Sequence, residues 1–136
     1  MAELMAIEQC LDILIEFNLH NTIIKGDSEL IINSVKQLGM SIALDKFSRH
    51  WRLLQVYYRI QSHLRILRTL SFVHVRRDAN RVADWLANEG VRCARYNRCC
   101  LWESVPTEQL REGCYTLART DRENYQHMKG NLAIDH

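Results

Sequence analysis

The chain has 136 residues, 47% of them hydrophobic, with a single proline and a formal net charge of +2. This length and apolar content suit one folded domain and argue against a largely disordered chain. The N-terminus has no basic signal-like segment, and no apolar run approaches the roughly 18 residues that a membrane span requires. We therefore predict an intracellular protein, nuclear or cytoplasmic, with no membrane partner.

The first part of the chain predicts a helix, a strand and a second helix. Residues 2–18 form one helical pattern with two apolar faces, which carry Leu4, Ile7, Leu11 and Leu14 on one side and Ala6, Cys10, Ile13 and Phe17 on the other. A helix this apolar is expected to be covered on most sides. Residues 21–26 predict a strand ended by Gly26, and Ser28 can N-cap a helix that runs to about Leu38.

The middle of the chain repeats the alternation of helix and strand. Residues 46–67 predict a long helix. The stretch at 69–75 is apolar on both faces, as a strand inside a parallel sheet is. Asp78 or Asn80 then opens a last helix that closes at Gly90 or slightly beyond.

The predicted order is helix, strand, helix, helix, strand, helix. This order defines an α/β fold in which one parallel pair of strands is joined by a helical crossover. We assign residues 1–97 to this domain and residues 98–136 to a C-terminal extension, which is partly disordered because residues 120–136 are polar and aperiodic. Two strands make a small sheet for such apolar helices, so we expect the domain to be incomplete at its N-terminus.

The cysteines point to no special chemistry. Their number, five, is odd, Cys99 and Cys100 are adjacent, and no pair has C-x-x-C spacing. Neither a disulfide framework nor a zinc site is expected, and the thiols are interpreted as reduced.

The modest net charge hides an uneven distribution. Residues 1–45 contain two basic and seven acidic side chains, residues 46–98 contain twelve and three, and residues 99–136 contain four and six. A basic middle between acidic ends indicates a polyanionic partner, although a solvated charged face explains such a run equally well.

Three carboxylates occupy positions that can hold a metal ion. Asp27 follows the first predicted strand at its carboxyl end, Asp84 lies early in the last helix, and Glu3 lies in the first turn of the first helix. We expect all three to converge at one end of the sheet. Converging carboxylates repel one another unless a hard cation such as Mg²⁺ lies between them.

Each carboxylate also has a purely structural interpretation. Asp27 can cap the helix that follows it, a role for which Ser28 competes. Glu3 can be a first-turn acid that the helix dipole favours, and Asp84 a solvated helix residue. Spacing alone leaves both interpretations open.

Two stretches of the sequence carry a family resemblance. "AELMAIEQCLDILIEFNLHNTIIKGDSELIINSV" and "FVHVRRDANRVADWLANEG" together resemble the ribonuclease H type 1 family, especially its divergent plant branch related to non-LTR retroelement reverse transcriptases. The likeness covers residues 2–91. In that family A-E-x-x-A, a strand ending in D-S, and N-x-x-A-D each supply a metal-binding carboxylate, and these motifs fall on Glu3, Asp27 and Asp84.

The resemblance implies a fold that begins with three antiparallel strands, the first bearing a further metal-bridging Asp. Those strands have no counterpart in this sequence, so a missing N-terminal segment is an expected partner. With that segment present, the resemblance implies cleavage of RNA in RNA/DNA hybrids by two Mg²⁺ or Mn²⁺ ions, which leaves a 5′ phosphate and a 3′ hydroxyl.

His74 and Asn80 each have two interpretations. The family often carries a His ahead of the last Asp that helps proton transfer or product release, and His74 is the candidate here. The strand period also places His74 on the same face as Leu70 and Phe72, which indicates a core or strand-end His. Asn80 either orients the site or caps the helix.

Basic side chains accompany the predicted site. We assign nucleic-acid contacts to Arg49, Arg52, Arg76, Arg77 and Arg81, because a site that collects acids needs nearby positive charge to admit a polyanion. The aromatic residues of the long helix, Trp51, Tyr57 and Tyr58, are interpreted as core.

Three functions are consistent with these patterns. The first is a ribonuclease H-like nuclease that acts on RNA/DNA hybrids or RNA once its missing segment is supplied. The second is a catalytically inactive, retroelement-derived remnant that only binds nucleic acid. The third is a non-catalytic interaction domain whose carboxylates are caps and surface residues.

Overall fold

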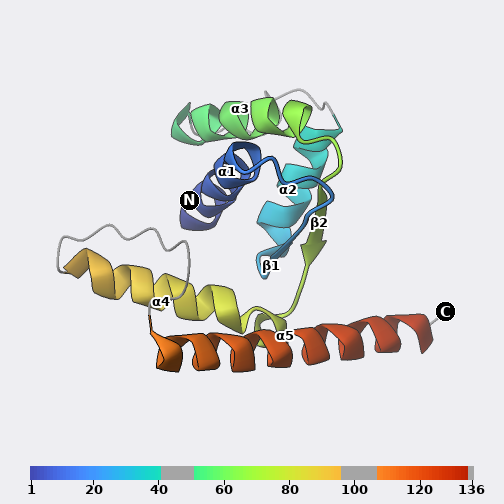
Figure 1. Cartoon of the computed structure of the whole chain (residues 1–136). Coiled ribbons are helices and arrows are strands. Elements are labelled where there is room, and N and C mark those ends of the chain that lie inside the picture. The colour runs from blue at the N-terminus through green and yellow to red at the C-terminus, as the bar shows by residue number, and fades with distance from the viewer. Residues whose placement is uncertain (41–50, 96–106, 135–136) are drawn as a thin grey trace. The chain divides into compact units, whose positions relative to one another are not determined.

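The elements follow one another as α1, β1, α2, α3, β2, η2, α4 and α5 in a computed structural model that describes residues 1–40, 51–95 and 107–134 (Figure 1). The chain divides into two units, Met1–His74 and Val75–His136. The predicted α/β fold with one parallel strand pair is confirmed. The predicted boundary after residue 97 lies outside the described residues.

The first unit contains a strand pair joined by a helical crossover. Its elements are α1 (Ala2–Glu16), β1 (Ile23–Gly26), α2 (Glu29–Gly39), α3 (Trp51–Ile66) and β2 (Ser71–His74). The strands run parallel, and the register pairs Ile23 with Ser71 and Gly26 with His74. The predicted helix, strand, helix, helix and strand are therefore all present, with bounds within a few residues of those expected. The start of the predicted long helix, residues 46–50, falls outside the described residues.

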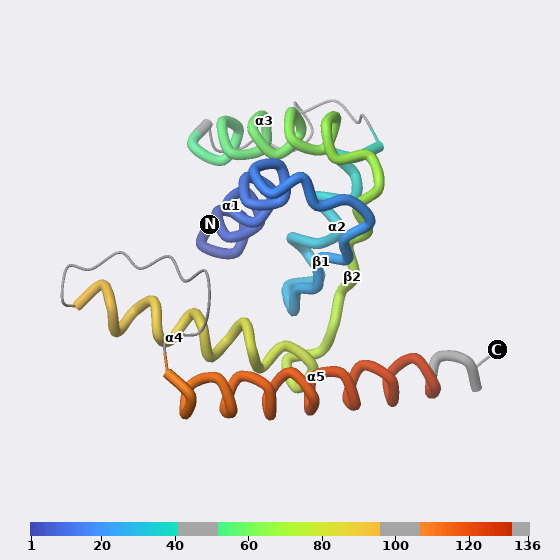
Figure 2. The backbone as a smooth tube through the Cα atoms, in the orientation of Figure 1, coloured from blue at the N-terminus to red at the C-terminus, as the bar shows by residue number. Residues whose placement is uncertain are grey.

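The chain reverses direction between α1 and β1 through a Schellman motif. The N–H of Leu19 donates to the carbonyl of Leu14 at 2.9 Å, and that of Asn18 donates to Ile15 at 3.1 Å. Asn18 has φ 52°, and Asn21, just before β1, has φ 59°. Asn tolerates this left-handed region better than most residues, which explains why the reversal uses it twice. Figure 2 shows the chain leaving α1, turning back and entering β1.

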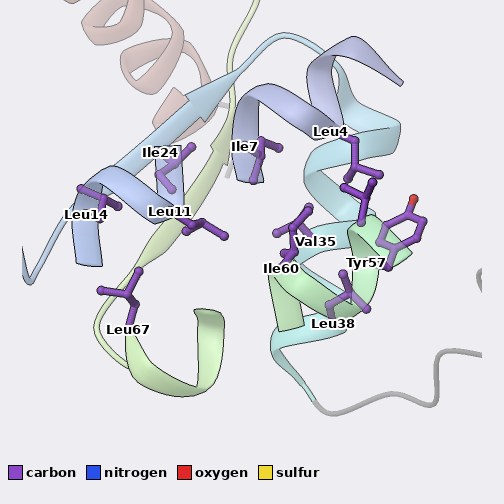
Figure 3. Close-up of a cluster of buried hydrophobic side chains, with 11 residues drawn as sticks. Leu4, Ile7, Leu11, Leu14, Ile24, Val35, Leu38, Tyr57, Ile60 and Leu67 are labelled. Atoms are coloured by element: carbon purple, nitrogen blue, oxygen red, sulfur yellow. The ribbon is translucent and has the colours of Figure 1, made fainter. Parts of the chain in front are cut away.

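One apolar cluster holds the first unit together. Figure 3 shows Leu4 and Leu14 toward opposite ends of this cluster, with side chains from both α1 and α3 between them. Leu11, Val35 and Ile60 are fully buried at 0% exposure. Burying each such side chain contributes about 1.5–3 kcal/mol, so α1, α2 and α3 form one cooperative core. Tyr57 belongs to it, as predicted, whereas Tyr58 is exposed.

An ion pair and a histidine–carboxylate contact join α1 and α3. Arg59 pairs with Glu8, and His63 Nε2 lies 2.7 Å from Asp12 Oδ1. One member of each pair is more than half exposed, so each contributes at most about 1 kcal/mol. Arg59 is thus engaged within the protein.

The expectation that α1 is covered on most sides is wrong for the described residues. Its first apolar face is buried in the core, but on the second face Ala6 and Ile13 are exposed and Cys10 is half-buried. Phe17, at the end of this face, is 60% exposed. Within the first unit, α3 packs on the first face of α1.

The second unit is helical. It contains the 3-10 helix η2 (Arg77–Ala79), α4 (Arg81–Arg95) and α5 (Glu108–Ile134). The predicted last helix is confirmed, although it passes through Gly90 to Arg95. The predicted loose tail over 120–136 is wrong up to residue 134, because those residues form the second half of α5 and pack on η2 and α4.

No helix among residues 1–40, 51–95 and 107–134 combines the length and hydrophobicity needed to cross a membrane.

Candidate nucleic-acid and metal site

The parallel register places the ends of both strands together. Gly26 closes β1 and His74 closes β2, and the two are paired. Asp27, the next residue after β1, is exposed, and His74 is half-buried. The structure therefore brings Asp27 and His74 to the same end of the strand pair.

Gly26 allows close packing at the end of β1. A Cβ at this position would lie 3.1 Å from Cδ1 of Ile32, a core residue in α2. The missing side chain lets the start of α2 approach the strand end. Ser28 is the N-cap residue of α2, as predicted, but its side chain makes no capping hydrogen bond.

Glu3 lies at the same end of the first unit as Asp27. It is an exposed residue in the first turn of α1. α1 and β1 run in roughly opposite directions, so the N-terminus of α1 and the carboxyl end of β1 face the same way (Figure 2). Glu3 thus lies at the end of α1 that faces the same way as the carboxyl end of β1, but among the described residues it forms no three-residue metal-binding group with Asp27 and His74.

Asp84 belongs to the second unit. It is exposed in the first turn of α4, and its N–H donates to the carbonyl of Asn80 at 3.2 Å. Asn80 therefore begins the helix through its backbone, which agrees with the capping interpretation. Asn88 Nδ2 donates to the backbone carbonyl of Asp84 at 2.9 Å, so Asn88 does not engage the Asp84 carboxylate through this bond.

Two residues of α5 bind the segment that carries Asp84. Asp121 accepts hydrogen bonds from the N–H groups of Arg81 at 2.8 Å and Val82 at 3.0 Å. Asn124 Nδ2 donates to the carbonyl of Asp78 at 2.6 Å. Sequence analysis missed both residues, because they lie about 40 positions downstream in a segment read as loose. The residues next to Asp121 in the sequence do not indicate that it binds the N-terminus of a distant helix.

The basic residues are divided between the two units. Arg76, Arg77 and Arg81 are exposed and surround η2 in the second unit, while Arg52 is exposed on α3 in the first. Arg49 lies outside the described residues. The structure thus gathers three of the five predicted nucleic-acid contacts around the start of α4.

The predicted metal ligands have suitable chemistry but do not form a complete set within either unit. Carboxylate oxygens are the donors that Mg²⁺ and Mn²⁺ prefer. Within each unit, the described residues contain no group of three His, Cys, Asp or Glu side chains that could hold a metal ion. The convergence of Glu3, Asp27 and Asp84 stays a prediction.

These features define a class: an α/β protein with a parallel strand pair whose carboxyl end carries an acid, followed by an acid-bearing helix. A family model described as "Reverse transcriptase-like" matches residues 1–90, about two thirds of the chain. The chain belongs to this family, and the match supports a relationship to the ribonuclease H-like domains of retroelements. No curated protein and no solved structure matches the chain significantly.

Proposed function

We propose that the protein is a ribonuclease H-like domain that binds nucleic acid, with RNA/DNA hybrids or RNA as its substrate class. With a further metal-binding carboxylate completing the site, the domain would cleave the RNA strand with Mg²⁺ or Mn²⁺. The observation that supports this proposal is the placement of Asp27 and His74 at the paired ends of β1 and β2, in a chain of this family.

Each residue has a distinct part in the proposed site. Glu3 and Asp27 offer carboxylate oxygens from α1 and from the end of β1, and Asp84 offers a third from α4. The bound metal ions would activate water and stabilise charge on the phosphate. His74 is placed at the strand end to exchange a proton with product, and its half-buried position restricts its motion.

Substrate binding is assigned to the exposed arginines near η2. Arg76, Arg77 and Arg81 present positive charge beside the helix that carries Asp84. Their guanidinium groups bind phosphate oxygens of either strand without reading sequence. Affinity should therefore fall steeply as salt is raised.

The test is cleavage of a labelled RNA/DNA hybrid by the full chain with Mg²⁺ or Mn²⁺, with and without a three-stranded segment from a related ribonuclease H-like protein added in trans. Variants Asp27→Asn and Asp84→Asn should abolish any metal-dependent cleavage, while Asp12→Asn, which changes an acid on the α1–α3 contact, should retain it. Cleavage that survives both site variants would contradict these roles.

A second candidate function is binding without cleavage. It is favoured by the lack of a three-ligand group within either unit among the described residues. Under this alternative the hybrid binds in a salt-sensitive way, but no metal, added segment or combination of the two yields product. Absence of binding at about 50 mM salt would contradict both candidates and favour a protein interaction domain.

A further inference from the structure

The contact between α5 and the start of α4 places an acid among basic residues. Both oxygens of Asp121 are engaged, one with the N–H of Arg81 at 2.8 Å and the other with that of Val82 at 3.0 Å. Asn124 adds a bond to the Asp78 carbonyl at 2.6 Å, one turn further along α5. Helix α5 thus holds the segment from η2 to the first turn of α4 at three points.

The donors that Asp121 occupies are those that bind anions most readily. The first N–H groups of a helix lack intrahelical partners and carry partial positive charge. Three exposed arginines, Arg76, Arg77 and Arg81, lie in the same short segment of the chain. A carboxylate bound at this point offsets part of the charge that would attract a phosphate.

Helix α5 lies outside the part of the chain that the family match defines, which ends at residue 90. Its contact is therefore an addition to the family segment. All three hydrogen bonds join residues of the same unit.

We propose that α5 is an internal competitor for nucleic-acid phosphate: Asp121 holds the anion position at the start of α4 and lowers the affinity of the Arg76–Arg81 segment until α5 is displaced. This inference rests on the proposed nucleic-acid binding. It adds a regulatory element, the C-terminal helix, to that function.

The test compares two charge-neutral variants of the full chain, Asp121→Asn and Glu123→Gln. Each removes one negative charge from α5, but residues two apart on a helix face different directions, and Glu123 is exposed. Binding is measured by fluorescence anisotropy with a labelled RNA/DNA hybrid at about 50 mM salt. Circular dichroism checks that helix content is unchanged.

Asp121→Asn should raise affinity about fivefold, the size expected for removing one like charge about 4 Å from a phosphate when water fully screens the pair. Glu123→Gln should change it by less than about twofold, since a more distant exposed charge is screened. If Asp121→Asn loses helix content, Asn124→Ala replaces it, because this variant removes only the bond to the Asp78 carbonyl. It should also raise affinity.

Three results would overturn the inference. If the folded Asp121 or Asn124 variant binds the hybrid with unchanged or weaker affinity, α5 only stabilises the start of α4 and does not compete with phosphate. An equal rise in Asp121→Asn and Glu123→Gln would reduce the effect to net charge. If neither the natural chain nor any variant binds the hybrid, the proposed function fails together with this inference, whereas the first two results leave that function standing.

Discussion

Gly26 and His74 are paired as the last residues of two parallel strands. This register decides that Asp27, one residue beyond Gly26, emerges beside the end of β2. A shift by one residue would send each side chain of β1 to the opposite face. The pairing is therefore the structural basis for treating this end of the first unit as a site.

The packing at Gly26 predicts opposite effects for two glycine substitutions. Gly26→Ala should lower the free energy of unfolding by about 1 kcal/mol, because its Cβ would press on the buried Ile32. Gly90→Ala should raise it by about 0.5–1 kcal/mol, since Gly90 lies inside α4 with open space around it. Urea unfolding of both variants measures the difference. Equal effects of the two substitutions would contradict the role of close approach at Gly26.

The reversal between α1 and β1 predicts a strict preference at position 18. Asn18→Val should destabilise the chain by about 1–2 kcal/mol, because a β-branched residue is strained at φ 52°. Asn18→Gly, the control, should stay within about 0.5 kcal/mol of the natural chain, because glycine adopts this conformation freely. Thermal unfolding followed by circular dichroism is the measurement. A well-tolerated valine would show that this turn does not fix the direction of α1, and hence the location of Glu3.

Burial on α1 raises the pKa of the Cys10 thiol through desolvation. Alkylation of Cys10 by iodoacetamide at about pH 8 should therefore be slower in the folded chain than in urea, because the thiolate is the reactive form. The peptide that contains Cys10 is followed by mass spectrometry. As pH rises above the usual thiol range, the unfolded state loses this proton first, so the free energy of unfolding should fall. Equal alkylation rates in the two states would contradict this effect.

The arginines around η2 predict a salt-dependent loss of binding. The double variant Arg76→Ala, Arg77→Ala should weaken hybrid binding and lower the slope of log affinity against log salt by about 1–2. The control Arg111→Ala, Arg119→Ala removes the same charge from exposed positions of α5. Titration by fluorescence anisotropy at several salt concentrations compares them. An identical slope for both double variants would indicate attraction by net charge alone.

Local patterns allowed much of the first unit to be predicted. The apolar periods of residues 2–18 and the short β-branched run ending at Gly26 each produced the expected element, because such patterns depend on neighbours in sequence. The motifs also identified Asp27 and His74 as residues at strand ends. The register that pairs their strand ends needed the tertiary structure, since it depends on contacts across the crossover.

The sequence by itself determined the type and order of the elements up to α4 and the positions of the acids within them. Only the tertiary structure revealed that α1 buries one apolar face, and that α5 is a long helix whose Asp121 binds the start of α4. Both depend on long-range packing. The apolar periodicity of a polar helix such as α5 does not predict its contacts. The N–H groups that Asp121 binds lie about 40 residues away in the chain.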